Sequence, residues 1–105
     1  MDDVLCVTTT TERQEESRQL AKALVQQNLA ACVQVIGPIE STYRWEGEVR
    51  HATEWLCVAK TTRRQFDKLR EAIGKLHSYD EPEIIATPVV DGSPGYLAWV
   101  RSAVE

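Results

Sequence analysis

The amino-acid sequence predicts an α+β fold with the element order β-α-β-β-α-β followed by a terminal helix. Two segments, "VLCV" near the start and "WLCVA" near the middle, are apolar at successive positions, which is typical of central strands. Two other segments carry apolar residues at the spacing of amphipathic helices. Residues 41–45 alternate before a Glu-Gly pair, and a return strand runs from Glu48 to about Lys60, which indicates a long hairpin. This order is the ferredoxin-like split βαβ pattern, whose first and third strands are central.

The first part of the chain is expected to form a strand over residues 3–9 and a helix over about residues 12–28. Thr11 and Gln14 have the spacing of a capping box, so we expect them to cap this helix. The apolar face of the helix consists of Leu20, Ala21, Leu24 and Val25. A second strand, "LAACVQVI", is interrupted at Gly37-Pro38 before the long hairpin, and the missing proline N–H predicts a bulge or bend on an edge strand there.

The hairpin that follows is long for a chain of 105 residues. Glu46-Gly47 supplies a two-residue turn, with glycine at positive φ. Strands of about 14 residues reach about 45 Å, whereas a compact chain of this length is about 34 Å across. The ribbon must therefore overhang or bend at Gly37-Pro38. An overhanging ribbon is marginally stable alone and exposes Tyr43 and Trp45, so we predict that a neighbouring subunit covers it.

The last part of the chain is expected to form a helix, a strand and a second helix. Thr62 and Gln65 are spaced to cap the first of these helices. Its predicted buried residues are Phe66, Leu69, Ile73 and Leu76. "EIIATPVV" reads as the last strand, with an edge-type proline at Pro88. Ser93-Pro94 is an N-cap followed by proline at the first helical position, and it opens the terminal helix.

Length and composition predict one domain over residues 1–105. No run approaches the roughly 18–20 apolar residues of a membrane span, and a net charge of −4 disfavours nonspecific nucleic-acid binding. The start "MDDVLCV" lacks the basic and apolar regions of a signal peptide. Three cysteines without a CxxC motif fit structural thiols in a reducing compartment. We expect a cytoplasmic protein without membrane or nucleic-acid partners.

Candidate chemistry centres on His77, because the following residues include Tyr79 and three carboxylates. An imidazole near carboxylates can bind Cu(II), Zn(II) or Ni(II). The alternative is a solvated loop whose histidine caps the C-terminal end of its helix. The second histidine, His51, lies on the hairpin and is expected at a surface or interface. The P-loop, GxSxG, HExxH and GxGxxG motifs are all absent from the sequence, so we expect no enzymatic activity.

Several motifs in order resemble the CutA divalent-cation tolerance family over about residues 4–104. They are "LAACVQVIGPIESTYRWEGEV", Glu54, "VAKT", "LHSYDEPEI" and "GYLAWV". The resemblance implies a ferredoxin-like fold assembled as a PII-like homotrimer, in which the long hairpins pack against neighbouring subunits. We expect Tyr43, Trp45 and Glu54 in the trimer interface. Lys60 and Glu54 share one face of the ribbon by parity, so they could pair within or between subunits.

Some members of this family bind copper, and the resemblance implies a cysteine and two adjacent histidines as ligands. His77 takes the second histidine position, while Leu76 stands at the first and Thr9 at the cysteine position. Cys6 lies three residues before Thr9, so it points to the opposite face of a regular strand. Ser78 replaces the more usual proline after His77. One imidazole with oxygen ligands predicts weak binding of Cu(II) or another divalent cation, and no required cofactor.

Two other functions remain open. The first is a PII-like sensor that binds a small molecule in a cleft between subunits, lined by Lys60, Tyr79 and Glu83, by analogy of fold. The second is a non-catalytic trimeric scaffold. Our leading prediction is a cytosolic trimeric protein of metal-ion homeostasis with His77 as the metal ligand.

Overall fold

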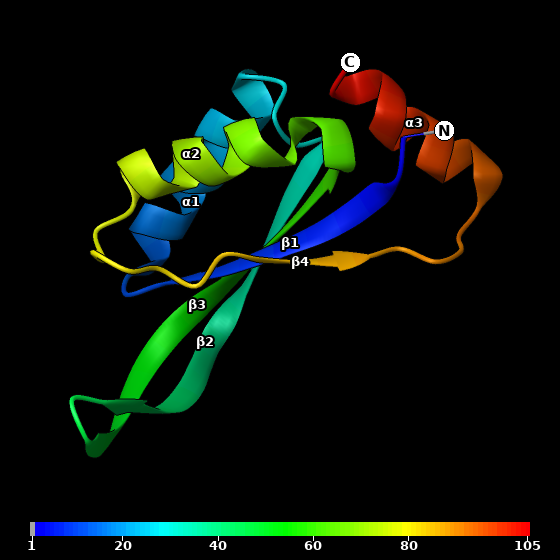
Figure 1. Cartoon of the computed structure of the whole chain (residues 1–105). Coiled ribbons are helices and arrows are strands. Elements are labelled where there is room, and N and C mark those ends of the chain that lie inside the picture. The colour runs from blue at the N-terminus through cyan, green and yellow to red at the C-terminus, as the bar shows by residue number, and fades with distance from the viewer. Residues whose placement is uncertain (1) are drawn as a thin grey trace.

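The computed structural model describes residues 2–105. Its elements in chain order are β1 (Val4–Thr11), α1 (Gln14–Gln26), β2 (Cys32–Trp45), β3 (Glu48–Thr62), the 3-10 helix η1 (Arg63–Gln65), α2 (Phe66–Leu76), β4 (Ile85–Pro88) and α3 (Pro94–Ala103). The strands form one antiparallel sheet in the order β2-β3-β1-β4 (Figure 1). Strands β1 and β3 are therefore central, and the predicted ferredoxin-like fold is confirmed.

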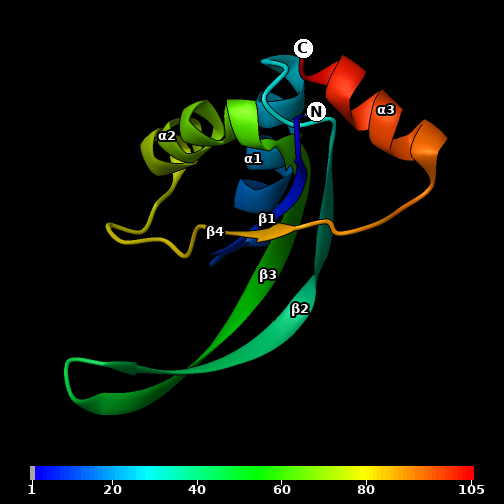
Figure 2. The same ribbon diagram turned by 45° about the vertical axis from the view of Figure 1, so that its right-hand side comes forward.

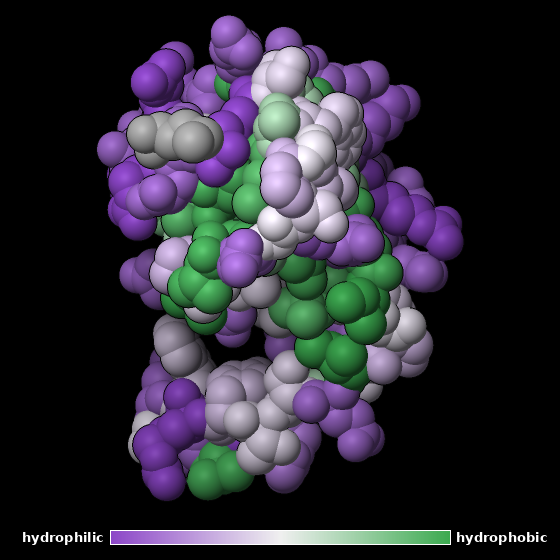
Figure 3. All heavy atoms as spheres, turned by 90° about the vertical axis from the view of Figure 1, so that its right-hand side faces the viewer, coloured by the Kyte–Doolittle hydropathy of each residue, from purple (hydrophilic) through white to green (hydrophobic). Residues whose placement is uncertain are grey.

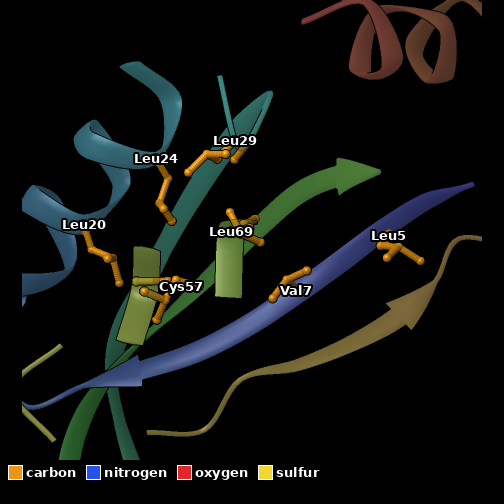
Figure 4. Packing of buried hydrophobic residues seen from close by; sticks show 10 residues of the cluster. Leu5, Val7, Leu20, Leu24, Leu29, Cys57 and Leu69 are labelled. Atoms are coloured by element: carbon orange, nitrogen blue, oxygen red, sulfur yellow. The ribbon is translucent and has the colours of Figure 1, made fainter. Parts of the chain in front are cut away.

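Helices α1 and α2 cover one face of the sheet (Figures 1 and 2). Alternate residues of the central strands, including Val7 and Cys57, are 1% exposed. They pack against Leu24 of α1 and Leu69 of α2 in the main core (Figure 4). The side chains on one face of the strands and those on the apolar faces of the helices therefore form one apolar layer.

The opposite face of the sheet is covered only at one end, by α3. There Val100 and Val104 pack on Val4 and Ala31 in a second, smaller apolar cluster. Ser93 occupies the N-cap position and Pro94 begins α3, as predicted, although the Ser93 side chain makes no capping hydrogen bond. Most of this face is thus open within a single chain.

The predicted capping box of the first helix is wrong. Thr11 is the last residue of β1, is fully buried and pairs with Trp55 of β3. Its hydroxyl donates to the Arg13 carbonyl at 2.9 Å rather than capping a helical N–H. Residue Arg13 takes the N-cap position without a side-chain bond. Strand pairing holds Thr11 in β1, so α1 starts later than expected, at Gln14.

The predicted cap of the second helix is wrong for the same reason. Thr62 ends β3, pairs with Val4 and leads into η1 without a side-chain capping bond. The Gln65 amide donates to the Val104 carbonyl at 2.6 Å. Leu76, expected in the core, is 50% exposed because it is the last residue of α2 and the chain turns inward at the next position.

The hairpin has the predicted turn and bulge. Glu46 and Gly47 form the two-residue connection, both at positive φ (50° and 77°), as a type I′ turn requires. The β2–β3 register shifts between Ile36 and Ile39, at the cis Gly37-Pro38 pair on edge strand β2. A Cβ atom at Gly37 would collide with the Trp55 ring, so glycine is required there.

The tip of the hairpin projects from the body. Strand β1 pairs with β3 only from Trp55 to Thr62, so residues 48–54 pair with β2 alone. The molecule is 44 Å long and only 25 by 22 Å across, and the two ribbon views show the arm extending away from the helices (Figures 1 and 2). Tyr43 and Trp45, on this arm, are 44% and 51% exposed.

The last strand is shorter than expected. The predicted segment is 83–90, but β4 includes only Ile85–Pro88 and pairs with β1 at the edge of the sheet. Pro88 ends this edge strand, which is where proline is tolerated. The short strand leaves residues 77–84 as a loop that runs from α2 past the end of β1, and this loop carries the candidate site.

Candidate functional site

The loop after α2 turns His77 into the protein. His77 occupies the C-cap position of α2, and its N–H donates to the Ile73 carbonyl at 2.9 Å. The side chain is fully buried. The residue therefore takes the C-cap position of the helix, but its ring points inward and is buried, unlike the solvated histidine that the alternative interpretation expects.

Both ring nitrogens of His77 already have partners. Nε2 lies 2.7 Å from the Thr10 carbonyl oxygen, which can only accept, so Nε2 carries the proton. Nδ1 accepts the Tyr79 N–H at 3.0 Å. These two bonds assign the neutral Nε2–H tautomer. A metal could bind either nitrogen only after one of these hydrogen bonds opens.

Glu16 of α1 forms hydrogen bonds to the same loop. Its carboxylate accepts the Ser78 N–H at 2.8 Å and the Ser78 hydroxyl at 3.0 Å. One of its oxygens also lies 3.7 Å from His77 Nδ1. Ser78 thus gives the loop two hydrogen bonds to α1. Glu16 could not be identified from the sequence, because its only signal is a place in the polar first turn of α1.

Tyr79 joins the loop to the base of the projecting arm. Its hydroxyl donates to the Glu54 carboxylate at 2.8 Å, and Glu54 is only 7% exposed. Burial raises the pKa of the Tyr79 phenol, and the hydrogen bond and negative charge of Glu54 raise it further. The rings of Tyr79 and His77 lie 4.9 Å apart. Glu54, a predicted interface residue, is therefore covered by its own chain.

The three positions implied as metal ligands do not assemble a metal centre. Thr9 is 2% exposed, and its hydroxyl has no hydrogen-bond partner among residues 2–105. Leu76 is apolar and half exposed. Cys6 pairs with Lys60 and lies on the face opposite Thr9, as predicted. Residues 2–105 contain no group of three His, Cys, Asp or Glu side chains placed to hold an ion. The arrangement does not fit a tightly held cation.

The three residues of the predicted cleft are spread along one chain. Lys60 donates to Gln34 across the β2–β3 pair. Glu83 accepts from the Thr8 hydroxyl at 3.4 Å. The Tyr79 hydroxyl is bound to Glu54. Glu54 and Lys60 are six positions apart on β3, which separates them by about 20 Å. No ion pair joins Lys60 and Glu54 in the described part of the chain.

The cysteines are all free thiols in different surroundings. Cys57 is buried, and burial, with the nearby charge of Glu16, raises the pKa of its thiol to about 11. Cys6 and Cys32 pair with Lys60 from its two sides and are partly exposed. The Cys32 sulfur lies 3.6 Å from the Tyr96 hydroxyl. Cys57 is thus a core residue, and the other two lie on the opposite face of the sheet, with Cys32 beside Tyr96 of α3.

The chain matches known proteins over nearly its whole length. A family model described as CutA1 divalent ion tolerance protein matches residues 5–103. The chain is 45% identical over 101 residues to the divalent-cation tolerance protein CutA of Thermus thermophilus, covering 96% of each chain. It is 39% identical to the chloroplastic protein CutA of Arabidopsis thaliana but spans only 56% of that protein.

Solved structures agree with the sequence matches. The CutA1 structure from Thermus thermophilus superimposes with a TM-score of 0.92 at 44% identity, covering 98% of each chain. The CutA structure from Xylella fastidiosa gives a TM-score of 0.95 at 32% identity, covering 98% of this chain and 99% of the other. The chain therefore belongs to the CutA1 divalent ion tolerance family.

Proposed function

We propose that the protein serves divalent-cation tolerance as a homotrimer. The observation that carries this proposal is the combination of an arm that extends beyond β1 and a sheet face that α3 covers only at one end. Apolar residues lie uncovered on these elements: Ile36, Trp45, Val49 and Ile85 are 51–58% exposed. Figure 3, seen from the side of α3, shows apolar surface gathered on the body above the arm.

Neighbouring copies are the partners that suit this surface. A monomer would leave both the apolar face and a two-stranded arm in water, and such a ribbon is marginal alone. The number three is what the family resemblance implies. Tyr43 and Trp45 supply the aromatic contact area on the arm, and aromatic residues are enriched in interfaces. The expected mass is three times the 11.9 kDa of one chain.

We propose that the trimer binds Cu(II) or another divalent cation weakly through His77, and not as a resident cofactor. Binding at His77 must first break the bond to the Thr10 carbonyl or the bond from the Tyr79 N–H. That requirement lowers the apparent affinity, since only the opened loop is competent. The family is named for cation tolerance and not for a reaction, and we propose a non-catalytic role.

Equilibrium dialysis with Cu(II) tests the metal proposal on trimers of the wild type, His77→Ala and His51→Ala. His51 is the matched control because it is exposed on the arm, where its Nδ1 lies 3.0 Å from the Thr42 hydroxyl. Saturable binding near one ion per chain that is lost only in His77→Ala supports the proposal. Binding unchanged in His77→Ala, or lost only in His51→Ala, contradicts it.

A PII-like sensor is our second candidate. Lys60 and Glu83 both have partners on strands of the sheet, at Gln34 and Thr8, and both can face a neighbouring copy across the open side. Within one chain Tyr79 lies too far from Lys60 along β3 for both to line the same cleft. A cleft at Lys60 would therefore have to be completed by Tyr79 of another subunit. A thermal-shift screen of the trimer against nucleotides and metabolites tests this function. A trimer that binds neither metal nor metabolite would be a scaffold.

We propose a cytoplasmic location on the evidence of the three free thiols, which persist in reducing compartments. No helix in residues 2–105 has the length and apolar character needed to cross a bilayer. Relatives occupy more than one compartment by name: the Arabidopsis thaliana protein is called chloroplastic and the Archaeoglobus fulgidus structure periplasmic. Fractionation of the native cell with an antibody to the chain tests the location.

A further inference from the structure

A groove with a volume of about 340 Å³ lies between the turn after α1 and the outer side of α2. Leu29, Ala72 and Leu76 form its apolar part, and Leu76 is 50% exposed. The groove belongs to the helix layer, whereas α3 lies at the opposite side of the molecule in both ribbon views (Figures 1 and 2). It is therefore separate from the open face of the sheet that the proposed trimer covers.

Positive charge is concentrated on the segment that forms one side of this groove. Residues 63–76, which form η1 and α2, contain five arginines and lysines and only two carboxylates, although the whole chain has a net charge of −4. Two of these arginines are paired with aspartates. Lys68 and Lys75, which line the groove, form no ion pair within residues 2–105. The groove therefore offers two ammonium groups, against the one carboxylate of Glu71, to a negatively charged partner.

The charged and apolar residues at the groove share one side of α2. Lys68, Ala72 and Lys75 follow one another at the i, i+4, i+7 spacing of a helix face. Lys68 and Lys75 are thus two turns apart, about 10 Å along the helix axis. The main core uses another side of the same helix, through Leu69 and Ile73. The helix therefore has a second face, on which two ammonium groups accompany exposed apolar surface.

Two kinds of partner suit this second face of α2: an anionic lipid surface and an acidic amphipathic helix. The hollow shape favours the helix, because a flat bilayer surface leaves a groove between two elements unfilled, whereas side chains that project from a helix enter it. A helix that lies along α2 also repeats its geometry. Carboxylates seven residues apart on that helix meet both lysines, and apolar residues between them lie over the groove.

We infer that the groove docks an amphipathic helix of another protein, with carboxylates at positions i and i+7 opposite Lys68 and Lys75 and apolar residues at i+3 and i+4 over Ala72. Glu71 lies between the two lysines and repels a carboxylate at the centre of the partner helix, so the central residues must be uncharged. A single helix in a groove of this size buries little surface, so the contact is weak and transient. None of these residues belongs to the arm or binds the cation in the proposed function, so the inference does not rest on it.

The test titrates the ¹⁵N-labelled protein, in the assembly that it forms in solution, with a synthetic helical peptide. The peptide carries two glutamates seven residues apart, leucines at the third and fourth positions after the first glutamate, and alanine or glutamine elsewhere. We expect saturable binding of one peptide per chain, with the amide signals of Leu29 and Ala72 shifted most. Lys68→Gln and Lys75→Gln should each weaken binding about threefold, and the double variant Lys68→Glu, Lys75→Glu should abolish it.

Charge reversal supplies the sharper comparison. The variant Lys68→Glu, Lys75→Glu should instead bind a peptide in which lysines replace the two glutamates. Lys22→Gln is the matched control and should leave binding unchanged, because Lys22 is exposed on α1 and does not line the groove. Lys68 and Lys75 are exposed as well, so none of these variants removes a buried group.

Vesicles of phosphatidylglycerol distinguish the lipid alternative. Vesicle binding that the double charge reversal abolishes, without saturable binding of the glutamate peptide, would overturn the inference in favour of an anionic lipid surface. Absence of saturable peptide binding, equal binding of the glutamate and lysine peptides to the wild type, or an equal loss in Lys22→Gln would also overturn it.

Discussion

The imidazole Nε2 of His77 lies 2.7 Å from the main-chain oxygen of Thr10 and donates its proton to it. This bond ties the loop after α2 to the end of β1, across 67 positions of sequence. The same ring accepts the Tyr79 N–H, and Tyr79 in turn reaches Glu54 on β3. The loop is therefore a structural junction between two strands and a helix. Substitutions in it should first of all lower the free energy of unfolding.

Replacement of His77 by alanine should lower the free energy of unfolding by about 2–4 kcal/mol. The change leaves the Thr10 carbonyl and the Tyr79 N–H without partners and opens a cavity at a fully buried site. Urea denaturation at fixed protein concentration measures it. Leu76→Ala, at the adjacent but half-exposed position, is the control and should change stability by less than about 1 kcal/mol. If His77→Ala and Leu76→Ala lowered the free energy of unfolding equally, His77 would not be the residue that holds this junction.

Stability should fall as pH rises above the ordinary titration range of tyrosine, in a way that depends on Tyr79. The folded protein holds the phenolic proton more tightly than the unfolded chain, because burial and Glu54 raise the pKa of Tyr79. The stabilisation is therefore complete below the ordinary pKa of about 10 and is lost as pH rises through the higher folded value. Thermal unfolding of the wild type and Tyr79→Phe from neutral to alkaline pH measures this slope. The slope should be shallower in Tyr79→Phe.

Cys57 should be the last thiol to react with an alkylating reagent. Its thiol is buried and its pKa is raised to about 11, so little thiolate forms at neutral pH. Mass spectrometry of timed alkylation should show Cys57 modified only after addition of denaturant. Cys57→Ser serves to assign the slow site. Modification of Cys57 in the native protein as fast as a free thiol would show that the core opens readily.

Substitution of two glycines by alanine should have opposite effects. Gly37→Ala places a methyl group into the Trp55 ring and should destabilise the protein by about 1–3 kcal/mol. Gly74→Ala has open space around it in α2 and should stabilise by about 0.5–1 kcal/mol, because alanine is the better helix former. Thermal unfolding at equal concentration compares them. A Gly37→Ala variant as stable as the wild type would contradict this description of the bulge.

The sequence predicts the sheet better than it predicts the helix starts. Continuous apolar runs identify β1 and β3 as central, and Glu46-Gly47 locates the turn of the hairpin, because both signals are local. The threonines at positions 11 and 62 have the spacing of helix caps, yet strand pairing keeps both in β-structure. Tertiary contacts thus override a local preference that a spacing rule alone suggests.

The candidate site is predicted only in part for a similar reason. His77 stands out by residue type, but helical periodicity cannot show that the chain turns there and buries the ring while Leu76 faces solvent. Glu16 and Thr10 reach the loop from distant parts of the sequence, and nothing local marks them. Long-range contacts of this kind appear only once the strands and helices are assembled.

The proposed homotrimer is tested by the mass of the protein in solution, measured by light scattering for the wild type and for the double variant Tyr43→Ser, Trp45→Ser. We expect three times 11.9 kDa for the wild type and partial dissociation of the variant, because the arm loses its aromatic contact area. Arg70→Gln, exposed on α2, is the control and should remain trimeric. A wild-type mass of a single chain, with the arm in water, would rule out the homotrimer.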